Sequence, residues 1–185
     1  MFKSRHSGQN FILSKIKTGG ILLALFLLFA ASAFAFPPGV LPDPALTPGV
    51  VDPAVTQGNI HSTICVNGYA AAHRHVTIEE KKEALARYRH KYPKWHRPPY
   101  EFDHLISLEL GGANDINNLW PEPMSLPSPS GRGAGVRENL GARAKDQVED
   151  YLHRQVCAGR IPLKDAQKEI RADWTKVYKE MKHGK

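Results

Sequence analysis

An uncharged, mostly apolar run of 15 residues, ILLALFLLFAASAFA at positions 21–35, decides which part of this 185-residue chain has to fold as a globular domain. The segment before it, residues 1–20, contains the basic residues Lys3, Arg5, Lys15 and Lys17 and no acidic residue. The run is shorter than the roughly 18 to 20 residues of a spanning helix. It ends in Ala33-Phe34-Ala35, the small-x-small pattern that signal peptidases cleave. We expect residues 1–35 to be a signal peptide cleaved after Ala35, with an uncleaved membrane anchor as the alternative.

Cleavage would leave residues 36–185, which is a comfortable length for one domain with its own core. The protein would then be periplasmic or secreted, without stable membrane association. The leader holds four of the 25 Lys and Arg and none of the 18 Asp and Glu, so the mature chain has a net charge of +3. This charge permits contact with a phosphate backbone but is by itself poor support for nucleic-acid binding.

Cys65 and Cys157 are the only two cysteines. In an oxidising compartment such a pair is expected to form a disulfide. The bond would close a loop of about 90 residues and stabilise the fold by about 4 kcal/mol if chain entropy dominates.

Residues 36–58 repeat Pro and Gly, which disfavour helix and sheet alike, and we expect a linker or an extended arm. Residues 59–185 would form the domain, with Ser62–Val66 as a possible short strand. Thr77 and Glu80 have the spacing of a capping box, and apolar residues then recur at helical intervals, so a helix is expected over about 78–91.

The second half of the chain combines strand and helix patterns. Residues 100–110 (YEFDHLISLEL) are typical of a strand running into a turn at Gly111-Gly112, and a second short strand is expected from Leu119. A long Pro/Ser/Gly loop follows. An apolar stripe from Leu140 to Val156 predicts a helix that brings Cys157 to its C-terminal end, and a last helix is expected after Pro162. The predicted class is α+β with a small sheet.

One segment, EFDHLISLELGGANDINNLWPEP at 101–123, has four elements in register: the Asp103-His104 pair, the Gly-Gly turn, Asn118 and the Leu119 that follows it. Asn118 lies fourteen residues after His104. The segment resembles the HNH (ββα-metal) endonuclease family, and within it an exported subgroup with DHLxxLELGGxxDxxNLWPEP. The resemblance implies a ββα-metal (His-Me finger) core with additional helices, and a phosphodiester hydrolase.

The resemblance also implies a role for each matched residue. His104 would be the general base, because an imidazole with a pKa near 6.5 can deprotonate water near neutral pH. Asp103 would be a metal ligand. Asn118 would brace the loop and orient the histidine through hydrogen bonds. Ligands that are hard oxygens favour Mg²⁺ or Mn²⁺ over zinc.

The third metal ligand of the family has no match at the expected position. Counting from Asn118, that position is Pro127, whose side chain cannot bind a metal. Asp146 and Asn139 are the candidates, and we favour Asp146 because the Lys145-Asp146 pair resembles that of the subgroup. Asp146 is equally compatible with a solvated helix face. Glu101 shares a strand face with Asp103 at i, i+2 and is either a support for the metal or a surface carboxylate.

The expected partner is nucleic acid, DNA rather than RNA, bound with low sequence specificity through its phosphates. A cluster of cations and aromatic rings at 90–97 either clamps that backbone or forms a solvated turn. The competing hypothesis is an exported, non-catalytic module that binds nucleic acid or protein on an HNH-like scaffold.

Overall fold

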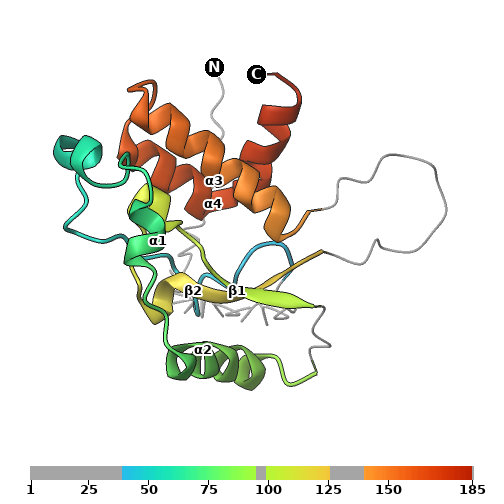
Figure 1. Ribbon diagram of the computed structural model, residues 1–185. Coiled ribbons are helices and arrows are strands. Elements are labelled where there is room, and N and C mark those ends of the chain that lie inside the picture. Colours follow the sequence, from blue (N-terminus) through green and yellow to red (C-terminus); the bar gives the residue numbers. More distant parts are fainter. Residues whose placement is uncertain (1–38, 95–98, 126–139, 185) are drawn as a thin grey trace, which may run out of the picture. The chain divides into compact units, whose positions relative to one another are not determined.

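The computed structural model describes residues 39–94, 99–125 and 140–184 (Figure 1). The predicted signal peptide and its cleavage site lie outside these ranges, as do Asn139 and the positions from Trp95 to Pro98. Among the described residues, no helix combines the length and the apolar character needed to cross a membrane.

The described chain is an α+β fold, as the sequence predicted. Its helices and strands are α1 (Tyr69–His73), α2 (Ile78–Lys91), β1 (Tyr100–His104), β2 (Leu119–Pro123), α3 (Ala142–Cys157) and α4 (Leu163–Lys182). Three short 3₁₀ turns complete the order: η1 (Gln57–Ser62), η2 (Leu108–Leu110) and η3 (Ile116–Asn118). The prediction of a short strand at 62–66 is wrong, because the end of η1 and a series of turns occupy that segment.

The two strands pair antiparallel, with Asp103 opposite Trp120 and His104 opposite Leu119. They lie between α2 on one side and the α3–α4 pair on the other (Figure 1). The first strand is shorter than expected. It ends at His104, and the chain then turns through η2 toward the Gly-Gly pair.

The Gly111-Gly112 turn connects η2 to the segment before β2, and both positions require glycine. Gly111 has a φ of 70°, in the left-handed region that glycine adopts without strain. At Gly112 a Cβ atom would stand 1.8 Å from the carbonyl oxygen of Ile106, which is a severe clash. The turn therefore fixes how the chain returns from β1 to β2.

The predicted capping box of α2 is present. Thr77 Oγ1 accepts a hydrogen bond from the Glu80 amide at 3.2 Å, and Glu80 Oε2 accepts one from the Thr77 amide at 2.7 Å. These two bonds satisfy amides that would otherwise lack partners at the start of the helix.

The proline-rich arm, residues 39–58, packs against the domain. Thr47 Oγ1 donates to the Leu119 carbonyl at 3.0 Å, and Trp174 Nε1 donates to the Val40 carbonyl at 3.0 Å. Val55 is buried in the core. The arm is therefore part of the folded unit, which the expected boundary at residue 59 did not include.

The core lies mainly between α3 and α4. Its fully buried side chains include Val148, Leu152, Ile170 and Trp174. Helix α4 bends at Asp173, whose backbone leaves helical geometry with φ −168° and ψ 89°. Asp173 Oδ1 then accepts the Thr175 amide at 3.0 Å, so this carboxylate caps the second segment of the helix.

Cys65 and Cys157 are bonded, as the sequence predicted, and are 92 positions apart in the sequence. The bond ties the segment before α1 to the C-terminal end of α3. His153 approaches both sulfurs closely enough to complete a three-ligand metal group. Because the disulfide already uses both sulfurs, this cluster is a covalent cross-link and not a metal site.

Replacing both cysteines with serine should lower the free energy of unfolding by about 2–4 kcal/mol, because the unfolded chain regains the entropy of a long open loop. Chemical denaturation of the variant and of the wild type, each with and without reductant, measures the difference. Reductant should destabilise the wild type and leave the variant unchanged. Equal stability of all four samples would show that the cross-link does not form or does not matter.

Candidate functional site

Four side chains share the face of the sheet that is turned toward α3. Residues directly opposite in an antiparallel pair point to the same side, as do residues at i and i+2. Asp103 is therefore on the same face as Trp120, and Glu101 is on the same face as its opposite residue Glu122. Like charges directly opposite each other are unfavourable in a sheet. Three carboxyl groups are thus held together on two short strands.

Lys145 of α3 enters this group of carboxyls with none of its side chain exposed. Its Nζ atom donates to Asp103 Oδ2 at 2.5 Å and to the His104 carbonyl at 2.8 Å, and it also donates to Glu149 Oε1. A buried ammonium is tolerated only when it is paired and hydrogen-bonded in this way. Lys145 therefore fixes the first turns of α3 against β1.

The carboxyls around Lys145 outnumber its single charge. Burial and the neighbouring Asp103 raise the pKa of Glu101 and of Asp146. Burial raises the pKa of Glu122 well above its usual value, and Glu122 hydrogen-bonds to Asp103. Burial opposes ionisation of Asp103 as well, but the adjacent Lys145 overcomes it and holds the pKa of Asp103 below its usual value. Asp103 is therefore the carboxyl of this group whose ionised form is most favoured, and the single charge of Lys145 does not balance the carboxyls around it.

His104 points away from the acidic face and is almost fully buried. Its Nε2 lies 3.1 Å from Asn114 Oδ1. The Asn114 amide group donates through Nδ2 to the His73 carbonyl, so its Oδ1 faces the ring and Nε2 must carry the proton. Burial lowers the pKa of His104. The lowered pKa favours the neutral ring, and the buried Nδ1 has no hydrogen-bond partner among the described residues.

Asn118 is fully buried and braces the loop between the strands. Its Oδ1 accepts from the Ile106 amide at 2.9 Å, and its Nδ2 donates to the carbonyls of Ile106 at 3.0 Å and Ala113 at 2.9 Å. The bracing expected of Asn118 is therefore present. The side chain that contacts His104 is Asn114, which the sequence analysis did not single out.

Asp146 lies on the exposed side of α3 next to Lys145, close enough to Asp103 and Glu101 for the three carboxyls to influence one another. Its position on α3 brings it to the same acidic face as Asp103. The alternative, Asn139, lies outside the described residues.

The donors of this face fit a hard divalent cation. All of them are carboxylate oxygens, which Mg²⁺ and Mn²⁺ prefer. Glu122 Oε1 is buried beside Asp103 and has no hydrogen-bond partner in the described part of the chain, which is costly unless something else satisfies it. A cation beside Asp103 would satisfy this oxygen and reduce the repulsion among the carboxyls.

Three residues of the site were missed by sequence reasoning. Lys145 was noted only as the neighbour of Asp146 and resembles a solvated lysine in a helical pattern, and Asn114 stands in a turn sequence where asparagine is common. Glu122 alone carried a signal, because it stands in a strand directly after the matched Asn118-Leu119 pair.

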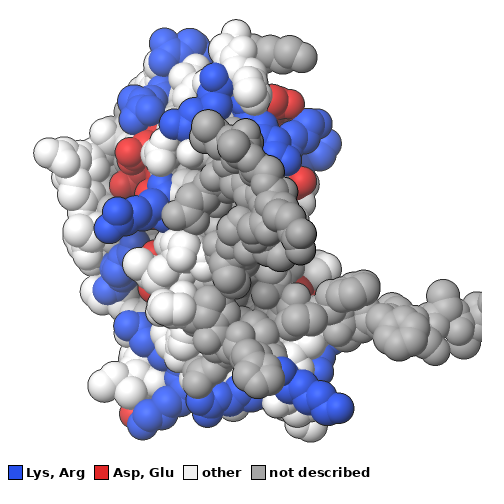
Figure 2. Space-filling view, turned by 90° about the vertical axis from the view of Figure 1, so that its right-hand side faces the viewer, with Lys and Arg blue, Asp and Glu red and all other residues white. Residues whose placement is uncertain are grey.

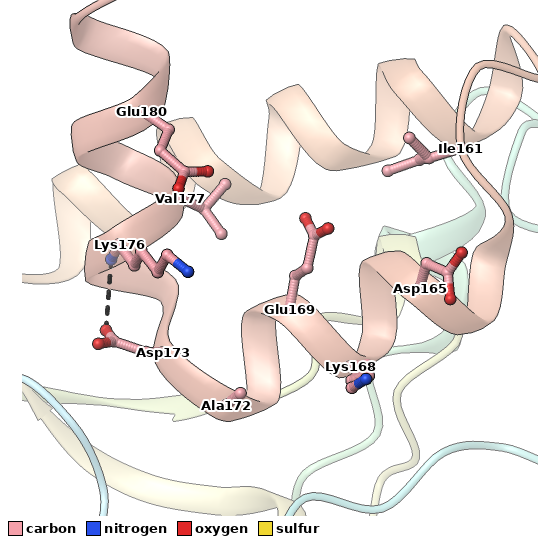
Figure 3. Close-up of a pocket in the computed structure, with 9 residues that line it drawn as sticks. All are labelled: Ile161, Asp165, Lys168, Glu169, Ala172, Asp173, Lys176, Val177 and Glu180. Carbon is pink, nitrogen blue, oxygen red and sulfur yellow. Dashed lines mark hydrogen bonds between the residues drawn. The ribbon is translucent and has the colours of Figure 1, made fainter. Parts of the chain in front are cut away.

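A cavity of about 410 Å³ lies elsewhere, at the bend of α4 (Figure 3). Glu169 and Lys176 reach into it from the two segments of the helix on either side of Asp173. No residue that lines it comes from the strands or from α3. The cavity is therefore separate from the Asp103 and His104 site.

Lys145→Met should lower the free energy of unfolding by about 3–5 kcal/mol, because it leaves the Asp103 and Glu149 carboxyls buried without their cation. Adding Glu149→Gln should recover part of the loss by removing one of those charges. The exposed Lys168→Met on α4 is the matched control and should change stability by less than about 0.5 kcal/mol. Similar denaturation curves for the two lysine variants would show that Lys145 does not hold α3 to β1.

Comparisons of this chain with protein-family models, with curated proteins and with solved structures find no match.

Proposed function

We propose that this chain is an exported, metal-dependent endonuclease of the HNH type, whose β1, β2 and α3 form a ββα-metal core. The observation that carries the proposal is a pair of neighbours on β1 with opposite properties. His104 presents a neutral ring with a free Nδ1, and Asp103 presents an ionised carboxylate within an acidic group. A proton acceptor beside a cation site is what water-driven phosphodiester hydrolysis requires.

In this proposal His104 Nδ1 takes the proton of the attacking water. Asn114 keeps the opposite nitrogen protonated through the 3.1 Å contact at Nε2, so the lone pair remains on Nδ1. The lowered pKa of His104 favours the neutral ring, in which Nδ1 carries no proton. Asn118 contributes indirectly, because it fixes the loop from which Asn114 projects.

Asp103 and Asp146 would hold the divalent cation, and Glu122 is a further carboxylate within the same group. A bound Mg²⁺ or Mn²⁺ supplies charge that stabilises the phosphate and the leaving oxygen. Lys145 engages Oδ2 of Asp103 and thereby fixes the orientation of that carboxylate.

The proposed substrate is nucleic acid, DNA rather than RNA, cleaved with low sequence specificity. On the face shown in Figure 2, Lys and Arg side chains lie at the upper end, along the left edge and at the lower end of the view. Basic side chains of this kind contact phosphates without reading bases. Of the predicted cation cluster, His90 and Lys94 are exposed, whereas Lys91 pairs with Asp43.

A second candidate is an exported binding module without catalysis. The observation that favours it is that Lys145 already neutralises Asp103, the principal expected ligand. The two candidates differ in a simple assay. A nuclease should degrade plasmid DNA when Mg²⁺ or Mn²⁺ is added and stop with EDTA, whereas a binding module should only retard the plasmid in a gel.

His104→Ala should slow cleavage by about 10²- to 10⁴-fold, because the general base is lost. Binding of the same DNA should be nearly unchanged, and thermal unfolding checks that the buried substitution still permits folding. His61→Ala removes an exposed histidine on η1 and should cleave like the wild type. Wild-type rates in a folded His104→Ala protein would remove this residue from the mechanism.

The metal requirement separates the two candidates for the third ligand. Asp146→Ala deletes a carboxylate beside Asp103, so half-maximal cleavage should need far more Mg²⁺ or Mn²⁺. The N-cap of α3 is Gly141, so Asn139→Ala removes no capping side chain from that helix and should leave the metal requirement unchanged. Metal titrations of the cleavage rate for both variants and for Asp103→Ala measure this. A raised requirement in Asn139→Ala alone would transfer the ligand role to Asn139.

A further inference from the structure

Arg74 stands at the end of α1, and one side chain, Asn114, links the backbone on either side of it to His104. It is the residue that caps α1, between His73 and His75. Asn114 Nδ2 donates a hydrogen bond to the His73 carbonyl at 2.5 Å, and the His75 amide donates one to Asn114 Oδ1 at 3.4 Å. The same Oδ1 contacts His104 Nε2 at 3.1 Å. The backbone on both sides of Arg74 is therefore tied to the amide that orients the histidine.

The guanidinium of Arg74 is exposed and has no hydrogen bond or ion pair with any residue that the structure describes. Its charge nevertheless acts on three groups of the site. It partly offsets the rise in the pKa of Glu101 and of Asp146, and it adds to the lowering of the pKa of His104 that burial causes. Among the described residues, Arg74 is thus an unpaired cation whose charge reaches both the carboxyls and the histidine.

An anionic substrate would need such a cation. The face beside α3 carries Glu101, Asp103 and Asp146, and a phosphodiester approaching it meets like charge. The buried Lys145 cannot help, because Asp103, Glu149 and the His104 carbonyl already take its donors. Arginine offers several N–H donors in a planar fork that matches two oxygens of one phosphate.

We propose that Arg74 binds the phosphate of the phosphodiester that is cleaved, through its non-bridging oxygens, and that Asn114 positions Arg74 and His104 together. This inference rests on the proposed nuclease function and adds the residue that brings the substrate to the site. Arg74 contacts substrate in this arrangement, whereas Asn114 is a positioning residue.

The test compares Arg74→Ala, Arg74→Lys and Arg160→Ala in the full mature chain. Arg160 is an exposed arginine beyond the C-terminal end of α3, while the Asp103 contact lies near the start of that helix. The Arg160→Ala substitution therefore removes one arginine charge, as Arg74→Ala does, but at a position distant from the site. Two quantities are measured with one fluorescent DNA duplex: kcat/KM for cleavage with Mn²⁺, and binding by anisotropy in proteins that also carry His104→Ala.

Arg74→Ala should reduce kcat/KM by about 10- to 100-fold and weaken binding by about tenfold or more, because charge-assisted bonds to the phosphate are lost. Arg74→Lys should recover part of both losses, and Arg160→Ala should stay within about twofold of the wild type. Arg74→Ala values within twofold of the Arg160→Ala values, in a folded protein, would overturn the inference. If the wild type cleaves no DNA, the nuclease proposal fails, and equal binding by the two alanine variants then overturns the role of Arg74 as well.

Discussion

The ammonium group of Lys145 joins the two parts of the fold that have to meet for a site to exist. It bonds to the Asp103 carboxylate and to the His104 carbonyl on β1, and it also bonds to Glu149 one turn further along α3. A buried charge of this kind contributes little net stability compared with an apolar pair, but it penalises any other arrangement severely. The ion cluster therefore selects one position of α3 on the strands, and it leaves Asp146 on the same acidic face.

On the side of β1 where His104 lies, side-chain amides hold the structure together instead of ion pairs. Asn118 holds the loop after His104 through three hydrogen bonds, and Asn114 extends from that loop to the ring. A neutral histidine on one side of a strand and an ionised aspartate on the other thus occupy adjacent positions in different surroundings. The separation keeps the carboxylate from pairing with the ring, so each group retains its own chemistry.

Local pattern in the sequence predicted those elements whose contacts are local. The Thr77 and Glu80 spacing predicted α2, and the stripe from Leu140 to Val156 predicted α3, because both depend on residues one or two turns apart. Lys145 and Asn114 were not predicted. Their roles come from contacts with β1 and α1 that are 41 residues distant in each case, and no local pattern distinguishes a buried lysine or asparagine from a solvated one. The packing of the proline-rich arm was not predicted for the same reason.

The central claim is that the acidic face beside Asp103 holds a divalent cation. Crystals of the mature protein soaked in Mn²⁺, with diffraction data collected at the manganese absorption edge, test it most directly. The account predicts one strong anomalous peak within about 2.0–2.4 Å of an Asp103 carboxylate oxygen, and its loss in Asp103→Ala crystals. A peak confined to another acidic group, such as Glu169 and Glu180 at the bend of α4, with none at Asp103, would contradict the account.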